Sequence, residues 1–341
     1  MTSTTMKSTF ERVVQGRNLR PTSVIAICVI AVLVLLPAFA EGYTLTSYRD
    51  VLLFALFALS LDLFWGKTGI LSFGHATFFG LGAYGMAITA IHLEVNPAWV
   101  SLVGLAVGVG LSALVSLIVG YFILYGGVRG AYFTIVTLAL TLIANHIAVG
   151  WSDVTGGDSG LIGIPPFSVF GLSFADPIAS YYLALLVLAV CLFGSMWVMS
   201  GRLGLILTAI QDDETKVQTL GYKTPFLLLM TFVASASMAA IGGGLYAAAN
   251  GFVAPDMIAL LLSTEVIIWV AVGGSGTLIG AVIGTFIVWW LQQKISSINA
   301  SAWPIAIGTF FILLVLVFPK GPGAFVVEKI KKLRRDREVV Q

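Results

Sequence analysis

The sequence has few charged residues and few that bind metals or form disulfides. Asp, Glu, Lys and Arg make up 10% of the 341 residues, whereas soluble domains carry about 25%, and this scarcity excludes a soluble globular domain. The two cysteines, Cys28 and Cys191, lie inside apolar runs and support neither a disulfide nor a metal site. No cluster of His, Cys and carboxylates has zinc spacing, and no basic patch with interleaved aromatics indicates nucleic acid binding.

Long apolar runs are what the sequence has in abundance. Hydrophobic residues make up 58% of the chain, and runs such as residues 23–40 do not alternate between apolar and polar positions as the strands of a membrane barrel do. The pattern predicts an all-α polytopic membrane protein with about ten transmembrane helices. The predicted spans are 23–40, 51–66, 69–91, 98–125, 131–150, 181–200, 225–249, 259–277, 278–295 and 304–318. Some of these, around 66–91 and 259–295, are expected to be broken or re-entrant.

The distribution of Lys and Arg supports this number of spans and gives it an orientation. If the N-terminus is cytoplasmic, all of the 18 Lys and Arg except Arg49 and Lys294 fall on the cytoplasmic side, as the excess of positive charge in cytoplasmic loops requires. Both termini are then cytoplasmic. The expected organisation is a cytoplasmic segment at 1–22, a transmembrane domain at 23–319 and a basic cytoplasmic tail at 320–341. The transmembrane domain contains an external loop at 151–180 and an internal loop at 201–224.

The first apolar run has a second interpretation. Lys7, Arg12, Arg17 and Arg20 precede it and it ends in small residues at Ala40, so it also resembles a signal peptide cleaved at that point. The run is long for the core of a signal peptide, which spans about 7–15 residues, and further spans follow it. An uncleaved first transmembrane helix is therefore favoured.

The internal loop carries the pattern of an amphipathic helix. Its apolar residues recur at helical spacing, and they are Leu203, Ile206, Leu207, Ile210, Val217 and Leu220. Asp212, Asp213 and Glu214 form an acidic cluster on the expected exposed side, and Gly221 follows at the position of a C-cap glycine. Helices that lie on anionic lipid usually carry Lys and Arg instead. The pattern therefore favours a helix that docks in a groove of a cytoplasmic protein over one that lies on the membrane.

This loop resembles the coupling segment of ABC importer permeases of the branched-chain amino-acid (LivM-type) family. The family's Gly-Arg start, Ala-Ile-(Arg/Gln)-Asp-(Asn/Asp)-Glu centre and Leu-Gly end match Gly201, Arg202, Ala209, Ile210, Gln211, Asp212, Asp213, Glu214, Leu220 and Gly221. Residues 69–84, 128–140 and 273–284 agree with the family in the same order, and residues 155–165 resemble its external glycine-rich loop. Lys67, Lys216 and Thr219 depart from the family's pattern.

The resemblance implies a function and a set of partners. The chain would be the permease subunit of an ATP-driven importer in a bacterial cytoplasmic (inner) membrane, for branched-chain or other hydrophobic amino acids. It would pair with a second homologous permease, two cytoplasmic ATPase subunits and an external solute-binding protein. The loop residues that would couple it to the ATPases are Gly201, Arg202, Ala209, Ile210, Asp212, Asp213, Glu214 and Gly221. Residues 58–66 also look like urea-type permeases, which leaves urea or a short amide as an alternative solute.

The chain has no recognisable ATP-binding motif. Residues 66–68 read Gly-Lys-Thr, but Leu61 stands where a phosphate-binding loop begins with glycine. In the second Lys-Thr pair, Tyr222 replaces the glycine that should precede the lysine. We therefore expect a transporter subunit that is not an enzyme and holds no cofactor, driven by ATP hydrolysis in partner subunits. An ion-coupled secondary transporter that acts alone is the alternative.

Three ionisable residues fall inside predicted spans, where a charge costs about 2.5 kcal/mol or more. Asp62 is interpreted as a structural group that bonds the backbone of the broken segment that follows it. His75 and Glu265 are either satisfied packing groups or parts of the solute pathway. In the secondary-transporter alternative they would form the proton relay.

Small residues interrupt two predicted spans. In residues 69–91 they step by three or four along one helix face, and Gly74, Gly82 and Gly85 crowd the opposite side. Close approach on two sides predicts a position at the centre of the bundle. Residues 273–276 form a similar interruption, and paired interruptions mark solute sites in transporters built from repeats. The candidate pathway residues are Ser72, Gly74, His75, Phe78, Glu265, Gly273 and Gly274.

Overall fold

The computed structural model describes residues 19–38, 42–92, 99–298, 305 and 308–309 of the chain, and nearly all of their regular structure is helical. The helices are α2 (Leu19–Leu35), α3 (Gly42–Thr68), α4 (His75–His92), α5 (Val100–Tyr125), α6 (Ala131–Gly150), α7 (Ser152–Thr155), α8 (Pro177–Ser200), α9 (Arg202–Thr219), α10 (Thr224–Asn250), α11 (Leu260–Gly273) and α12 (Ile279–Ile298). The short 3₁₀ segments are η1 (Leu36–Ala38), η2 (Gly157–Ser159) and η3 (Pro255–Ile258). The two-residue strands are β1 (Leu161–Ile162), β2 (Ser168–Val169), β3 (Leu172–Ser173) and β4 (Phe252–Val253).

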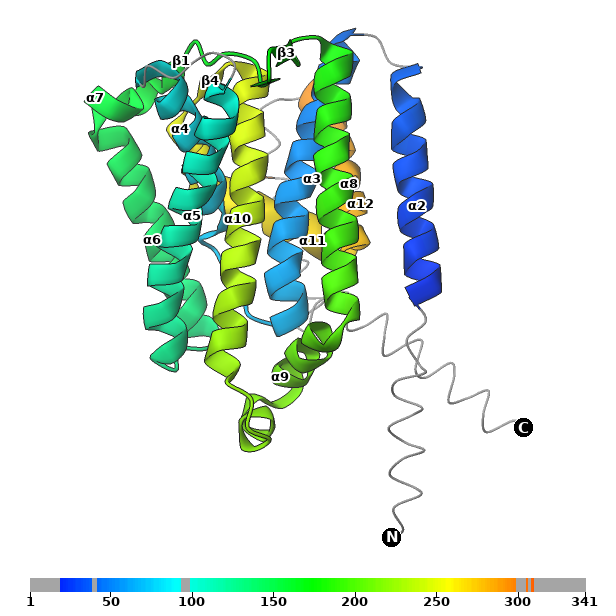
Figure 1. Ribbon diagram of the computed structural model, residues 1–341, viewed down its shortest axis with the longest axis vertical. Helices are drawn as coiled ribbons and strands as arrows, with labels where there is room; N and C mark the ends of the chain where they lie inside the picture. The colour runs from blue at the N-terminus through cyan, green and yellow to red at the C-terminus, as the bar shows by residue number, and fades with distance from the viewer. Residues whose placement is uncertain (1–18, 39–41, 93–98, 299–304, 306–307, 310–341) are drawn as a thin grey trace.

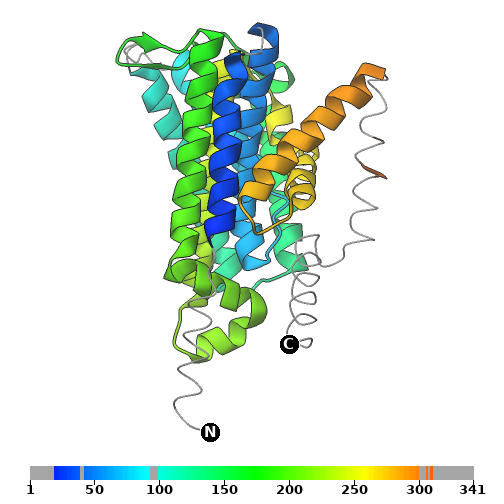
Figure 2. The ribbon, with the colours of Figure 1, turned by 90° about the vertical axis from the view of Figure 1, so that its right-hand side faces the viewer.

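The long helices form a bundle whose two ends differ (Figure 1). The strands lie at one end, which we call the strand end, and α9 lies at the other, which we call the α9 end. β1 pairs antiparallel with β4, with Leu161 opposite Val253, and β2 pairs antiparallel with β3. Most helices run along the long axis of the bundle, whereas α12 crosses it obliquely (Figure 2).

The helices have the length and composition of membrane spans. Among the described residues, five helices are long and apolar enough to cross a membrane: residues 44–68 of α3, and α5, α6, α8 and α10. The predicted all-helical class is therefore confirmed, and these five helices are candidate membrane spans. The tenth predicted span at 304–318, the tail at 320–341 and most of the segment at 1–22 lie outside the described residues. The number of ten spans and the cytoplasmic position of both termini stay predictions.

The predicted boundaries are correct for some spans and wrong for others. α6 begins and ends at the predicted residues, whereas α3 begins at Gly42 rather than at residue 51. The predicted span at 69–91 is wrong at its start, because Gly69 has a φ of +74° and terminates α3. Residues 69–74 are not helical, and α4 begins only at His75. The segment is thus broken, as expected.

Close packing between helix backbones places α4 at the centre. A Cβ added at Gly82 would overlap the backbone of Ala240 in α10, and one added at Gly85 would overlap Gly108 in α5. Gly243 of α10 packs in the same way against the carbonyl oxygen of Phe79. Small residues let helices approach to this distance inside a membrane bundle. The predicted central position of this helix is confirmed.

The helices differ strongly in burial. The most apolar window of α3 is 78% buried inside the chain, whereas those of α5 and α6 are only 22% buried. α5 and α6 expose large apolar side chains such as Phe122 and Tyr132. A helix that is apolar all round and buried on most sides belongs to the interior of a bundle. The interior is therefore formed by α3, α4 and α10, with α5 and α6 at the periphery.

Candidate functional site

α9 is two helical segments that meet at Asp213, not the single helix that its periodicity predicts. Asp213 has φ −162° and ψ 96°, which are not helical values. Its side chain accepts a hydrogen bond from the backbone N–H of Lys216 at 3.1 Å and forms an ion pair with the Lys216 ammonium at 2.9 Å. A side chain that accepts a hydrogen bond from the third residue after it is an N-cap. Asp213 therefore ends the first segment and caps the second, and these contacts lower the pKa of its carboxyl.

Glu214 points into the protein, so the expectation of three exposed carboxylates is wrong for this residue. Both of its carboxylate oxygens accept hydrogen bonds from the Arg129 guanidinium, at 2.8 and 2.9 Å. Thr224 donates a further hydrogen bond at 2.7 Å. The hydrogen bonds from Arg129 are the main reason why the pKa of Glu214 lies below its usual value. The pair therefore stabilises the folded chain above the ordinary pKa of Glu, and this stabilisation is lost as the pH falls through the lowered pKa.

The Arg129 guanidinium connects α9 to the bundle. It also donates to the carbonyl oxygens of Leu124 and Val128, at 2.9 and 3.0 Å, where α5 ends and the chain turns toward α6. A bidentate Arg–carboxylate pair fixes geometry more strictly than a Lys pair does. The second segment of α9 is thus tied to the α5–α6 turn as well as to α10, which follows it in the chain.

The remaining α9 predictions are confirmed in most respects. Leu207, Ile210 and Val217 are buried against the bundle, whereas Leu203 and Leu220 are exposed. Gly221 has a φ of +89°. The N–H of Gly221 bonds to the carbonyl of Gln218 and that of Tyr222 to the carbonyl of Val217, which is the Schellman pattern that ends helices at glycine. Gly201 lies between α8 and α9 in an extended conformation, and Arg202, Ala209 and Asp212 are exposed.

Residues 69–74, between α3 and α4, are held by threonines of α6. The N–H of Phe73 donates to Thr137 Oγ1 at 3.2 Å, and Thr141 Oγ1 donates to the carbonyl of Phe73 at 3.1 Å. Thr134 Oγ1 donates to the carbonyl of Leu71 at 3.0 Å. Backbone groups without helical partners must be satisfied in this way inside an apolar bundle. The connection is therefore ordered by hydroxyl groups.

Four predicted pathway residues lie together around this connection. Ser72, Gly74, His75 and Phe78 are all buried. His75 Nε2 lies 2.8 Å from Ser60 Oγ, and because Ser60 donates its own proton to the Phe57 carbonyl, the imidazole is the donor. The ring stacks on Phe57 with centroids 5.5 Å apart. These contacts are those of a residue that holds α4 to α3, and none of the four residues lines the cavity described below.

Asp62 bonds a different segment from the one predicted. It is fully buried, and its two carboxylate oxygens accept hydrogen bonds from Gly276 N at 2.6 Å and Leu278 N at 2.8 Å. The Lys67 ammonium donates to the Gly276 carbonyl at 2.6 Å. The end of α3 therefore fixes the connection between α11 and α12, and not the residues that follow α3 itself. Gly273, the last residue of α11, packs against Gly280 of α12, and Gly274 begins the connection between the two helices.

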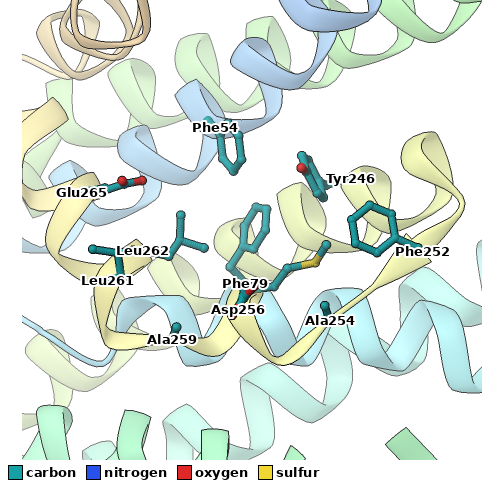
Figure 3. Close-up of a pocket in the computed structure, with 11 residues that line it drawn as sticks. Phe54, Phe79, Tyr246, Phe252, Ala254, Asp256, Ala259, Leu261, Leu262 and Glu265 are labelled. Carbon is teal, nitrogen blue, oxygen red and sulfur yellow. The ribbon is translucent and has the colours of Figure 1, made fainter. Parts of the chain in front are cut away.

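A cavity of about 360 Å³ lies between α3, α4, α10, η3 and α11 (Figure 3). Its lining is mostly apolar and aromatic, with two carboxylates. The lining residues are Phe54, Phe79, Tyr246, Phe252, Ala254, Asp256, Met257, Ala259, Leu261, Leu262 and Glu265. Of the predicted pathway residues, Glu265 alone is among them. Asp256 and the aromatic residues of the lining were not predicted, although an acidic residue at the edge of a predicted span is a signal that indicates Asp256.

The fold and this cavity define the chain as a helical membrane protein built around a buried core of three helices. Residues 43–319 match a family described as "Branched-chain amino acid transport system / permease component". The chain belongs to this family. No solved structure matches it.

Curated relatives carry similar names. The chain is 26% identical over 295 residues to "High-affinity branched-chain amino acid transport system permease protein LivM" of Salmonella typhimurium, and equally so to the Escherichia coli protein of that name. Each match covers 79% of this chain and 67% of the relative. The corresponding protein BraD of Pseudomonas aeruginosa is 26% identical over 292 residues, which are 81% of this chain and 94% of BraD.

Proposed function

We propose that the chain is the transmembrane permease subunit of an ATP-driven ABC importer in a bacterial inner membrane, and that it carries branched-chain or other hydrophobic amino acids. It pairs with a second homologous permease and two cytoplasmic ATPase subunits, and an external solute-binding protein delivers the solute. Family membership and the names of the relatives support the solute class. The coupling role is supported by α9, which is kinked at Asp213 and is held to the bundle by the Arg129–Glu214 pair.

The position of α9 supports a route by which an ATPase would drive the bundle. α9 follows α8 after Gly201 and precedes α10, which begins at Thr224. Arg129 adds a link to the α5–α6 turn. α10 packs against α4 through Gly82 and Gly243. A displacement of α9 by an ATPase would therefore reach the central helices, where it would open one side of the solute route and close the other.

Asp212 is the sharpest test of docking, because it is the exposed member of the acidic cluster. Asp212→Lys should abolish ATP-driven uptake and the stimulation of ATPase activity, while the permease still assembles in the membrane. Asp158→Lys is the matched control, since Asp158 is an exposed carboxylate at the strand end. Uptake at the wild-type rate in Asp212→Lys would exclude a docking role for this residue.

The Arg129–Glu214 pair tests transmission separately from docking. Arg129→Ala should lower uptake at least tenfold while the ATPase subunits remain bound, and the exchange Arg129→Glu with Glu214→Arg should restore part of it. Lys216→Ala is the control, because it breaks an ion pair that lies wholly within α9. Equal losses in Arg129→Ala and Lys216→Ala would exclude a special role for the link. Uptake by the purified chain without ATPase subunits would instead favour the ion-coupled secondary transporter.

A further inference from the structure

We propose that the cavity between α3, α4, α10, η3 and α11 binds the solute inside the permease as an α-amino acid. In this site Asp256 and Glu265 accept the ammonium group, and the aromatic wall holds the apolar side chain. The inference rests on the proposed function and adds a binding site to it. It favours amino acids over urea and short amides, the other solute class that the sequence leaves open, because urea and short amides carry no ammonium group.

The size of the cavity fits a small solute. Binding cavities in proteins span about 300–1,000 Å³, so 360 Å³ lies at the lower end of that range. The cavity has contributions from helices that are far apart in sequence, including α3, α4 and α10 of the buried core. A solute held here would contact the same central helices that α9 can move. The site is therefore placed where binding and conformational change can be linked.

The wall of the cavity is suited to an apolar side chain. The rings of Phe54, Phe79 and Tyr246 lie mutually close, with centroids 5.1, 5.9 and 6.0 Å apart. Figure 3 shows these rings and Phe252 around the same space, with Leu262 at its border. Contact between this wall and a branched aliphatic group is favourable, because it buries apolar surface and adds dispersion attraction. It offers little to a small polar amide.

The charge of the lining is of one sign. Asp256 and Glu265 are its ionisable acids, and no Lys, Arg or His is among the lining residues. Asp256 is exposed and Glu265 is half-buried, so a cation in the cavity can reach both carboxylates. A cation close to carboxylates at the edge of an apolar surrounding gains more from their charge than it would in water. An apolar wall beside two acids is thus complementary to a solute with one apolar end and one cationic end.

The first experiment measures solute preference on the unchanged protein. The complete transport complex, reconstituted in nanodiscs without the solute-binding protein, is titrated with radiolabelled leucine in competition with leucinamide, N-acetylleucine and urea. Leucine and leucinamide should compete, whereas N-acetylleucine, which lacks the ammonium group, should be at least tenfold weaker and urea should not compete. Competition by urea or equal competition by N-acetylleucine would overturn the inference.

The second experiment assigns the site to residues. Asp256→Asn with Glu265→Gln, which keeps side-chain size, should weaken leucine binding at least tenfold, whereas Asp158→Asn, the control at the strand end, should leave it unchanged. Thermal unfolding of each variant shows whether the fold is retained. Phe79→Ala should weaken binding of leucine more than that of alanine, because the wall contacts the side chain. Wild-type leucine binding in the double variant would overturn the site.

The failure of this site and the failure of the proposed function give different results. If the complete wild-type complex does not import leucine with ATP and its solute-binding protein, the proposed function is wrong. If the wild type imports leucine and the double variant does so equally well, the function stands and the site is wrong.

Discussion

Two glycine-interrupted connections in this protein look alike in sequence and are held in different ways. In residues 69–74, before α4, the backbone groups of Leu71 and Phe73 bond to threonine hydroxyls of α6. Residues 274–278, between α11 and α12, are fixed by the carboxylate of Asp62 and the ammonium of Lys67, both in α3. Both connections obey the rule that buried backbone groups need partners. One is satisfied by neutral groups and the other by charged groups.

The difference has an energetic consequence. A neutral hydrogen bond contributes about 0.5–1.5 kcal/mol net, whereas one to a charged group contributes about 1.5–3 kcal/mol. Asp62 makes two such bonds from one buried side chain. The threonine connection divides its bonds among several side chains. Removal of a single side chain should therefore damage the α11–α12 connection more than the α3–α4 connection.

Asp62→Asn should have the largest effect on stability. The amide can accept one of the two backbone N–H groups, but its NH₂ group would face the other, which leaves that donor unsatisfied. We expect a loss of about 2–4 kcal/mol, from one unpaired buried donor and a weaker bond to the second. Thermal unfolding in detergent, followed by far-UV circular dichroism, measures it. The control is Asp158→Asn, and a melting temperature equal to that of this control would show that the carboxylate is not the anchor.

Gly276→Ala and Gly74→Ala should have intermediate and unequal effects. A Cβ at Gly276 would stand 2.8 Å from the Gly66 carbonyl oxygen, and one at Gly74 would stand 2.7 Å from that of Thr137. Gly276 in addition has a φ of +86°, which adds about 1–2 kcal/mol for a residue with a Cβ. Gly276→Ala should therefore unfold at the lower temperature. The reverse order would show that crowding dominates over backbone conformation.

The sequence predicted elements more reliably than the contacts between them. α6 matched its predicted bounds, because a continuous apolar run lies between Gly130 and Trp151, which end the helix on either side. The central position of α4 also followed from its small residues. Helix bounds and the central position of a helix follow from local periodicity and composition, and their prediction needs no knowledge of contacts between distant residues.

The contacts that define the candidate site depended on pairings that a single sequence does not show. Asp62 lies 214 residues before its partner Gly276, and Arg129 lies 85 residues before Glu214. The acidic cluster of α9 was predicted as one exposed group, but Asp213 caps a helix and Glu214 binds Arg129. Carboxylates that are neighbours in the sequence therefore have different surroundings in the folded chain. Asp256 and the aromatic wall were missed for the same reason, since they meet only in the folded bundle.

Thr141→Val should have the smallest effect of these changes. Its hydroxyl donates to the Phe73 carbonyl and accepts a hydrogen bond from Thr77 Oγ1 at 3.2 Å. Valine keeps the shape of the side chain without these two bonds. The Phe73 N–H keeps its bond to Thr137, and Leu71 keeps its bond to Thr134. We expect a loss of about 1–2 kcal/mol, the net contribution of two neutral hydrogen bonds.

The same unfolding measurement on the double variant Thr137→Val with Thr141→Val makes the comparison quantitative. If the hydroxyls act independently, the losses of the two single variants add. Because Thr137 and Thr141 serve the N–H and the carbonyl of one residue, Phe73, they share a partner and a departure from additivity is measurable. A double variant that loses more than the sum of the two single variants, and as much as Asp62→Asn, would show that the hydroxyl groups act as one anchor, equivalent to the carboxylate, and the distinction between the two connections would be lost.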